Sequence, residues 1–170
     1  MRQRLCYTTM WFLILGGTVQ PASAAVGDAG RIRSSDPYIE TLVRAAIDRS
    51  ATFRTIVRSI EETNGMVYIE PGQCRHGVRA CLSHAVVNAG GLRWLRVTID
   101  RSMSCEGLIE AIGHELRHAL EVLADPALTT MRAVYQFYSL IAQTTRGAFE
   151  TEAALQAGSA VEREIGRCRK

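Results

Sequence analysis

The sequence predicts an α+β fold in which a small, mostly antiparallel sheet packs on helices. Three features of the apolar pattern predict it. Apolar residues recur at helical spacing between residues 37 and 60, and they alternate as in strands between residues 66 and 99. The helical spacing returns from residue 105 and continues towards the C-terminus. Strands grouped between helical segments indicate the α+β class.

The first 24 residues have the layout of a secretory signal peptide. Two arginines form a positive start, an apolar stretch covers residues 10–19, and Ala-Ser-Ala at residues 22–24 offers a cleavage site. The apolar stretch is too short to span a bilayer comfortably, so no stable membrane span is expected after cleavage. We therefore expect export to a periplasm or the extracellular space, with an uncleaved membrane anchor as the alternative.

The chain from Ala25 onward has the length of one domain. We expect residues 25–35, rich in Gly, Ala and Ser, to be a flexible lead-in and residues 36–170 to form the domain. Two of the 20 Lys and Arg lie in the signal segment, so 18 remain against 17 Asp and Glu, a net charge of +1. This near balance argues against a nucleic-acid partner. The sequence leaves the oligomeric state open.

The first helical segment begins at Asp36-Pro37, with Asp as the N-cap and Pro at the first helical position. Apolar residues then keep helical spacing from Ile39 to Ile60, and we expect a break near Ser50. Asn64-Gly65 supplies a C-cap signal, which ends this helical part of the chain.

Strands are expected next. Residues 66–70 alternate as a short strand, and residues 73–80 form a polar loop. Residues 81–87 and 92–99 are expected to be two strands, because Asn-Ala-Gly-Gly at residues 88–91 has the composition of a hairpin turn. The segment 92–99 is also our candidate for a sheet edge that adds an extended peptide as a further strand.

Three helices are expected in the second half. An apolar stripe runs from Cys105 to Leu123, and Ser104 or Ser102 can cap that helix. Asp125-Pro126 repeats the cap-plus-proline signal and predicts a helix that continues to about Ala142. A last helix is expected from Phe149 to about Arg167.

Four cysteines follow the signal segment, and an even number in an exported domain favours disulfides. Three pairings are possible. We favour Cys74–Cys81, which closes a short loop, and Cys105–Cys168, which ties the C-terminus to the start of a helix. Zinc ligation by some of them is the alternative, but no pair has C-x-x-C spacing.

Residues 114–118 read His-Glu-Leu-Arg-His, the H-E-x-x-H pattern. On a helix, His114 and His118 lie on one face four residues apart, so both imidazoles can reach one metal ion. Glu115 lies beside that face, where it can deprotonate a metal-bound water. Arg117 stands at an inner position of the motif that is usually uncharged.

A catalytic zinc usually has three protein ligands and an open position. The long motif with a third histidine is absent, because Glu121 and Ala124 stand where its Gly and His would be. A glutamate about twenty residues after the second histidine is also absent, because that region holds Phe137 and Tyr138. Asp125 is close to the motif, but its role as a helix cap already explains it. Glu121 is either a partner that orients an imidazole or a solvated helix charge.

Glu150 and Glu152 remain as candidates for the third ligand. On a helical wheel Glu150 falls on a face of small apolar residues, whereas Glu152 falls on the opposite, polar face. A carboxylate on the small face points into a buried interface, where a metal ion makes it tolerable. We therefore expect one zinc ion held by His114, His118 and Glu150, with Glu152 as the alternative.

The motif at residues 114–118, together with a downstream Glu, resembles the gluzincin metallopeptidases. The segment Phe149–Ala154 resembles the E-x-x-A-D element of one gluzincin group, with Ala154 where that group has Asp. Short bacterial exported proteins with H-E-L-x-H-A-L-E and a later E-T-x-A-A are similar as well. The resemblance implies a zincin-like fold whose metal site lies between the H-E-x-x-H helix and a C-terminal Glu-bearing helix, with one zinc and Glu115 as the general base.

The resulting hypothesis is an exported zinc-dependent metallopeptidase that hydrolyses a peptide or protein substrate, with Glu115 as the general base. The oxyanion of such a reaction needs a further donor, and His84, Tyr135, Tyr138 and Arg146 are the candidates. One alternative is a non-catalytic, zinc-stabilised binding or regulatory domain. The other is a chance H-E-x-x-H in a disulfide-bonded helical protein.

Overall fold

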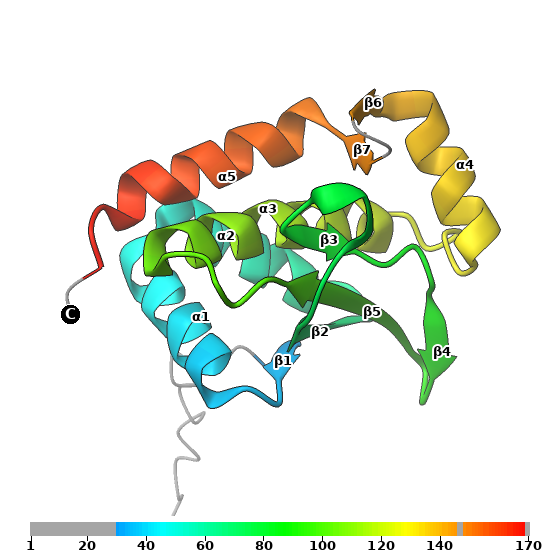
Figure 1. The fold of residues 1–170 in the computed structure, drawn as a ribbon. Helices are drawn as coiled ribbons and strands as arrows, with labels where there is room; N and C mark the ends of the chain where they lie inside the picture. Colours follow the sequence, from blue (N-terminus) through cyan, green and yellow to red (C-terminus); the bar gives the residue numbers. More distant parts are fainter. Residues whose placement is uncertain (1–29, 146–147, 169–170) are drawn as a thin grey trace, which may run out of the picture.

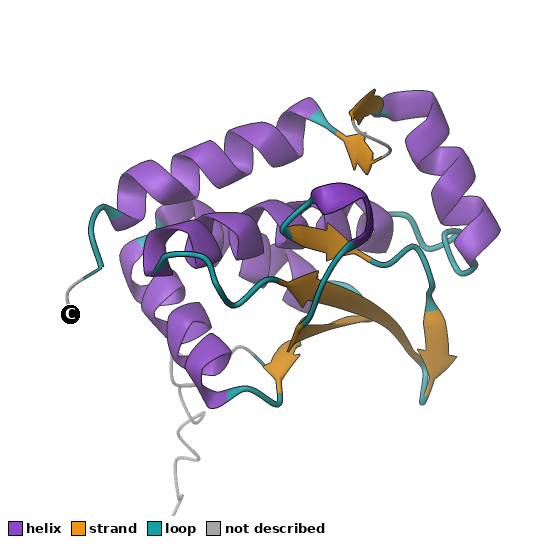
Figure 2. Ribbon diagram, in the orientation of Figure 1, coloured by secondary structure: helices purple, strands orange, loops and turns teal. Residues whose placement is uncertain are grey.

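In the described part of the chain, the fold consists of five helices, a five-stranded mixed sheet and a separate two-stranded sheet (Figures 1 and 2). The computed structural model describes residues 30–145 and 148–168. The expected signal peptide, residues 1–24, lies outside them. The expected α+β class is confirmed.

The first helical region is two helices, as expected. Asp36 caps α1 (Pro37–Arg49), and its carboxylate accepts hydrogen bonds from the backbone N–H groups of Tyr38 and Ile39. Ser50 ends α1, and its hydroxyl caps α2 (Ala51–Glu61) by accepting from Phe53 N at 2.9 Å. The expected break near Ser50 is therefore confirmed, and one serine serves both helix ends.

The sheet has five strands in the order β1-β2-β5-β3, with β4 also paired to β5. Their bounds are as follows: β1 Ile32–Ser34, β2 Gly65–Pro71, β3 Ala80–Leu82, β4 Val87–Ala89 and β5 Leu92–Ile99. The long β2–β5 pair and the β1–β2 pair are parallel, and β3 and β4 run antiparallel to β5. The expectation of a mostly antiparallel sheet is therefore wrong. Alternation of apolar residues reports which face of a strand is buried, and it does not report strand direction.

Three further details of the sheet differ from expectation. Residues 81–87, expected as one strand, are divided between β3 and β4. The hairpin turn is confirmed and is shorter than expected, because Gly90 and Gly91, both at positive φ, connect β4 to β5. Of the expected flexible lead-in, residues 25–35, Ile32–Ser34 form β1 and pair with β2, so these three residues belong to the sheet.

The helix α3 (Cys105–Ala124) is the central element. Ser104 caps it, as expected, by accepting a hydrogen bond from Gly107 N. Its apolar stripe is buried against the sheet and the other helices. The buried guanidinium of Arg93 on β5 donates to the carbonyls of Leu123 (2.6 Å) and Asp125 (2.7 Å), which satisfies groups at the C-terminal end of α3.

The next helix, α4 (Met131–Ile141), begins five residues later than Pro126, and Thr130 is its N-cap. Asp125 instead ends α3, and its carboxylate accepts from Ala127 N at 2.8 Å. The same Asp-Pro pair that starts α1 therefore makes a turn here, because an Asp side chain can bond to its own backbone two residues on.

The last helix also begins later than expected. Ala148–Glu150 form β7, which pairs with β6 (Gln143–Thr145), and α5 covers Glu152–Ile165. Thr151 is the N-cap, since its hydroxyl accepts from Ala154 N at 3.1 Å. The expectation that Glu150 lies on the C-terminal helix is therefore wrong, because a threonine cap fixes the helix start just after it.

The helix α5 lies across α3 on the side away from the sheet (Figure 1). The two helices approach closely at Gly113, where an added Cβ would lie 2.9 Å from Cγ2 of Val161. The Glu164 carboxylate near the end of α5 accepts hydrogen bonds from Ser50 Oγ and Thr52 N, which joins α5 to the start of α2. This packing fixes α5 along α3, with Gly158 against His114 and Thr151, at the start of α5, bonded to Glu121.

Both favoured disulfide pairs are formed. Cys74–Cys81 has a Cα–Cα distance of 6.1 Å, and Cys105–Cys168 has one of 6.2 Å. The first closes the loop between β2 and β3, and the second ties the end of the chain to the start of α3. The alternative, that these cysteines bind zinc, is thereby excluded for this structure.

Candidate metal centre

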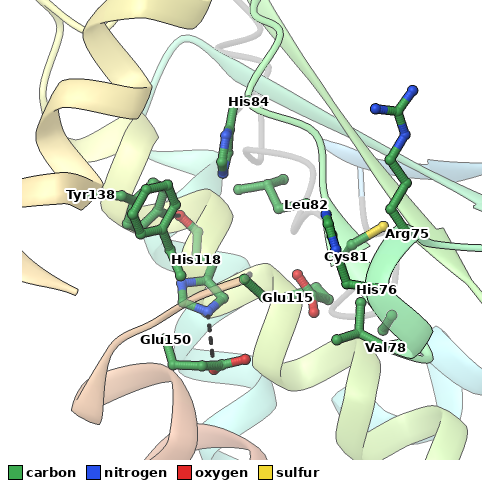
Figure 3. Close-up of a pocket in the computed structure, with 13 residues that line it drawn as sticks. Arg75, His76, Val78, Cys81, Leu82, His84, Glu115, His118, Tyr138 and Glu150 are labelled. Carbon is green, nitrogen blue, oxygen red and sulfur yellow. Dashed lines mark hydrogen bonds and ion pairs between the residues drawn. The ribbon is translucent and has the colours of Figure 1, made fainter. Parts of the chain in front are cut away.

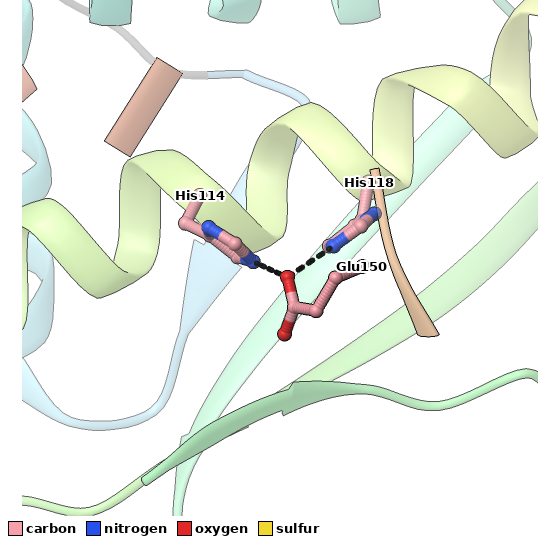
Figure 4. A group of neighbouring side chains, drawn as sticks. All are labelled: His114, His118 and Glu150. Carbon is pink, nitrogen blue, oxygen red and sulfur yellow. Dashed lines mark ion pairs between the residues drawn. The ribbon is translucent and has the colours of Figure 1, made fainter. Parts of the chain in front are cut away.

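The structure brings together the two histidines of α3 and Glu150 of β7 (Figure 4). Glu150 Oε2 lies 3.1 Å from His114 Nε2 and 3.8 Å from His118 Nε2. Zinc bonds of about 2.1 Å in a tetrahedral site place ligand atoms roughly 3.4 Å apart. The observed distances lie on either side of that value, so this His-His-Glu group could hold a metal ion.

Two atoms of the group have unmet bonding capacity. Within the described residues, His118 Nε2 and Glu150 Oε2 are buried and form no hydrogen bond, although both lie within ion-pair distance of a neighbour in the group. Buried polar atoms are nearly always partnered, because an unpartnered one loses its contact with water without compensation. A cation between these atoms would satisfy both, so the donor set fits a metal ion.

The charges within the group favour a cation as well. The imidazoles of His114 and then His118 lower the pKa of the Glu150 carboxyl to about 2. Burial opposes a charged His118, but the carboxylates around it, Glu121 foremost, raise its pKa to about 9. These shifts favour a positive charge between the side chains, and a metal ion can take the place of a proton there.

Glu121 contacts the site directly, which decides between its two expected roles. Its Oε2 lies 3.1 Å from His118 Nδ1, and its Oε1 accepts from the Thr151 hydroxyl at 2.8 Å. A carboxylate oxygen accepts here, so Nδ1 carries the proton and Nε2 faces Glu150. The same threonine caps α5, so one network fixes the His118 ring and the start of α5 beside Glu150.

Glu115 lies beside the group and faces a pocket of about 340 Å³ (Figure 3). Its side chain is buried, and burial raises the pKa of its carboxyl. The pocket lies between α3, the strand β3, the loop closed by Cys74–Cys81, α4 and β7. A buried carboxyl with a raised pKa next to a candidate metal group is suited to accept a proton and to release it again.

All four histidines of the chain lie at this site, although two of them stand outside the motif. His76, His84 and His118 line the pocket, and His114 belongs to the candidate metal group. Sequence reasoning gave no role to His76. The predicted closure of its loop by Cys74–Cys81 was the available signal, because the disulfide fixes the loop next to β3.

The other candidates are placed as follows. His84 lies in the pocket, and burial lowers the pKa of its imidazole, which favours the neutral form of the ring. The Tyr138 hydroxyl donates to the His118 carbonyl at 2.9 Å, and Tyr135 is exposed. Arg146 lies outside the described residues. Glu152 is exposed and accepts from Gln156, so the structure does not bring it to the group.

The expected substrate edge is misplaced. The strand β5, residues 92–99, is interior to the sheet, with β2 on one side and β3 and β4 on the other. The edge strand next to the pocket is β3, whose Ala80, Cys81 and Leu82 line it. The residue pattern of β5 fits a strand covered on one face and gives no information on its neighbours in the sheet.

The described chain is thus an α+β domain with a His-His-Glu group that could hold a metal ion. A scan of protein-family models gives no match, and neither do the curated proteins or the solved structures. In the part of the chain that the structure describes, no helix is long and apolar enough to cross a membrane. The two disulfides are compatible with an oxidising compartment outside the cytosol.

Proposed function

We propose that the protein is an exported zinc-dependent metallopeptidase of zincin-like fold. The proposal rests on one observation: His118 Nε2 and Glu150 Oε2 are buried, form no hydrogen bond within the described residues and lie close to His114 Nε2, at a pocket that Glu115 lines. Two imidazoles and one carboxylate are the donor set of many catalytic zinc sites. Zinc bound there supplies a Lewis acid that activates water and polarises the substrate carbonyl.

The residues of the chain have distinct tasks in this proposal. Glu115 takes a proton from the attacking water and passes it to the leaving amine, and its raised pKa suits both transfers. His84 is a neutral donor in the pocket and is the best placed of the candidates to hydrogen-bond the developing oxyanion. Glu121 keeps the His118 ring in place. The free edge of β3 binds an extended stretch of substrate backbone.

The second candidate function is a non-catalytic, zinc-stabilised binding domain. The size of the pocket favours it, because about 340 Å³ is at the lower end of the range for ligand sites. Such a pocket accepts one or two side chains of a peptide. As a peptidase, the protein would therefore act on short or unfolded peptides.

Metal content and peptide cleavage test the proposal together. We expect one zinc per chain in the purified protein and loss of zinc in His118→Ala and Glu150→Ala. The matched control Glu152→Ala, an exposed glutamate two residues from Glu150, should keep its zinc. Glu115→Gln should keep zinc and lose cleavage of unstructured peptides. Zinc with no Glu115-dependent cleavage would favour the binding domain, and no zinc in the wild type after metal supply would refute both functions.

A further inference from the structure

The pocket has a wall that the proposed chemistry does not use, the loop closed by Cys74–Cys81. Arg75, His76 and Val78 of this loop line the pocket (Figure 3). His76 has φ +59° and is followed by Gly77 at φ +70°, so the loop turns through two left-handed residues. A non-glycine residue rarely adopts this conformation, and such conformations gather at ligand sites. The disulfide and this turn together fix the backbone of Arg75 and His76 at the pocket, and the exposed Arg75 side chain extends outward at its rim (Figure 3).

Arg75 is available to a ligand. Two other arginines are engaged elsewhere, since Arg79 pairs with Asp100 at 3.3 Å and Arg96 pairs with Glu70 at 3.5 Å. Arg75 has no ion pair with any residue that the structure describes. Among the other ionisable residues that line the pocket, Glu115, His118 and Glu150 have tasks in the proposed chemistry. A guanidinium at the rim of a pocket matches a carboxylate through two parallel hydrogen bonds.

The opposite wall is aromatic. Phe149 stacks on Tyr138 with ring centroids 5.9 Å apart, and His84 lies 5.5 Å from Phe149 and 5.7 Å from Tyr138. All three line the pocket next to the candidate metal group. Such a wall packs against an apolar or aromatic side chain of a ligand. The two walls therefore differ in chemistry, with a cation on one side and aromatic rings on the other.

We propose that the pocket selects acidic peptides: a carboxylate side chain of the substrate pairs with Arg75, and a neighbouring aromatic side chain packs on the wall of His84, Tyr138 and Phe149. This inference rests on the proposed peptidase function and names its substrate class. The ion pair forms at an exposed rim, where such pairs are weak, so the preference for Glu over Gln is about fivefold.

The test uses blocked hexapeptides Ala-Ala-Phe-X-Ala-Ala and Ala-Ala-X-Phe-Ala-Ala, with Glu, Gln or Lys at X. Cleavage by the zinc-loaded protein gives kcat/KM for each peptide. Calorimetric titration of the same peptides into the Glu115→Gln variant gives binding without turnover. Arg75→Glu and the milder Arg75→Gln test the contact. Arg44→Glu makes the same charge change at an exposed site on α1 away from the pocket and controls for net charge.

We expect the wild type and Arg44→Glu to prefer Glu over Gln about fivefold, Arg75→Gln to lose the preference, and Arg75→Glu to prefer Lys. Cleavage in which the Glu preference is absent or unchanged by Arg75→Glu would overturn the substrate class and leave the peptidase standing. If no peptide is cleaved, the peptidase proposal fails, and only the calorimetric titrations test the acidic-peptide site. Tighter binding of the Glu peptides that depends on Arg75 supports the site, and equal binding of all peptides or no binding overturns it.

Discussion

Replacing Glu121 tests whether the contacts around His118 serve a metal ion. Glu121 accepts from His118 Nδ1 at 3.1 Å and from the Thr151 hydroxyl at 2.8 Å, and its side chain is only 8% exposed. Glu121→Ala removes both contacts, so the His118 ring loses the group that fixes its rotation and increases its basicity. Loss of such an outer partner lowers metal affinity by roughly 10–100-fold, or about 1.4–2.8 kcal/mol.

Competition with a chromophoric zinc chelator measures this affinity. Glu152→Ala is the matched control, because that glutamate is exposed and bonds only to Gln156 within the described residues. Thr151→Val separates the two halves of the network, since it removes the bond to Glu121 together with the cap on Ala154 N. Its main effect should be on stability, about 1 kcal/mol. A Glu121→Ala protein that binds zinc as tightly as the wild type would refute the assignment of Glu121 to the site.

Three further outcomes concern the frame that holds the site, and urea unfolding measures each of them. Arg93→Met should destabilise the protein by about 3 kcal/mol, because it leaves the carbonyls at the end of α3 without a donor, and a loss under 1 kcal/mol would contradict this. Opening the Cys105–Cys168 disulfide by Cys→Ser at both positions should cost about 4 kcal/mol for its sequence separation of 63, and an unchanged midpoint would contradict this. The hydrogen bond from Ser50 lowers the pKa of Glu164, so its contribution is present at neutral pH and lost as the pH falls through the folded-state pKa. Glu164→Gln should therefore flatten the acid limb of the stability curve, and an identical pH dependence would refute that role.

Several helix ends, the hairpin turn and the disulfides could be predicted because the residues that determine them lie close together in the sequence or in predicted elements. The N-cap at Asp36, the break at Ser50 and the hairpin turn at residues 90–91 depend on side chains that bond to their own neighbourhood or on glycine at positive φ. The disulfide pairs followed from loop lengths and from the predicted helix start at Cys105. Strand direction and strand neighbours could not be predicted, because they depend on how distant segments meet in space.

The prediction for Glu150 is instructive because its stated reason does not hold. The helical wheel placed Glu150 on a helix face lined by small apolar residues. In the structure this residue lies in β7, one residue before the Thr151 cap. The small residues of α5 do pack on α3, at Gly113 and around Val161. That packing also brings Glu150, which immediately precedes the helix cap, next to the two histidines of α3. The face was predictable from the sequence, and the element was not, because the cap hydroxyl competes with one further helical turn.

The stability of the metal-free protein distinguishes a catalytic from a structural role for zinc. The candidate ligands lie on or next to elements that other contacts already hold: α3 is buried against the sheet, α5 packs on α3, and a disulfide joins the start of α3 to Cys168. The protein stripped with a chelator should therefore keep its far-ultraviolet circular dichroism and its cooperative melting. Zinc at a thousand times its Kd adds about 4 kcal/mol by mass action, which raises the Tm of a domain of this size by about 10 °C. Unfolding on chelation would show instead that binding energy is spent on the fold, as in structural zinc sites, and would favour the binding domain over the peptidase.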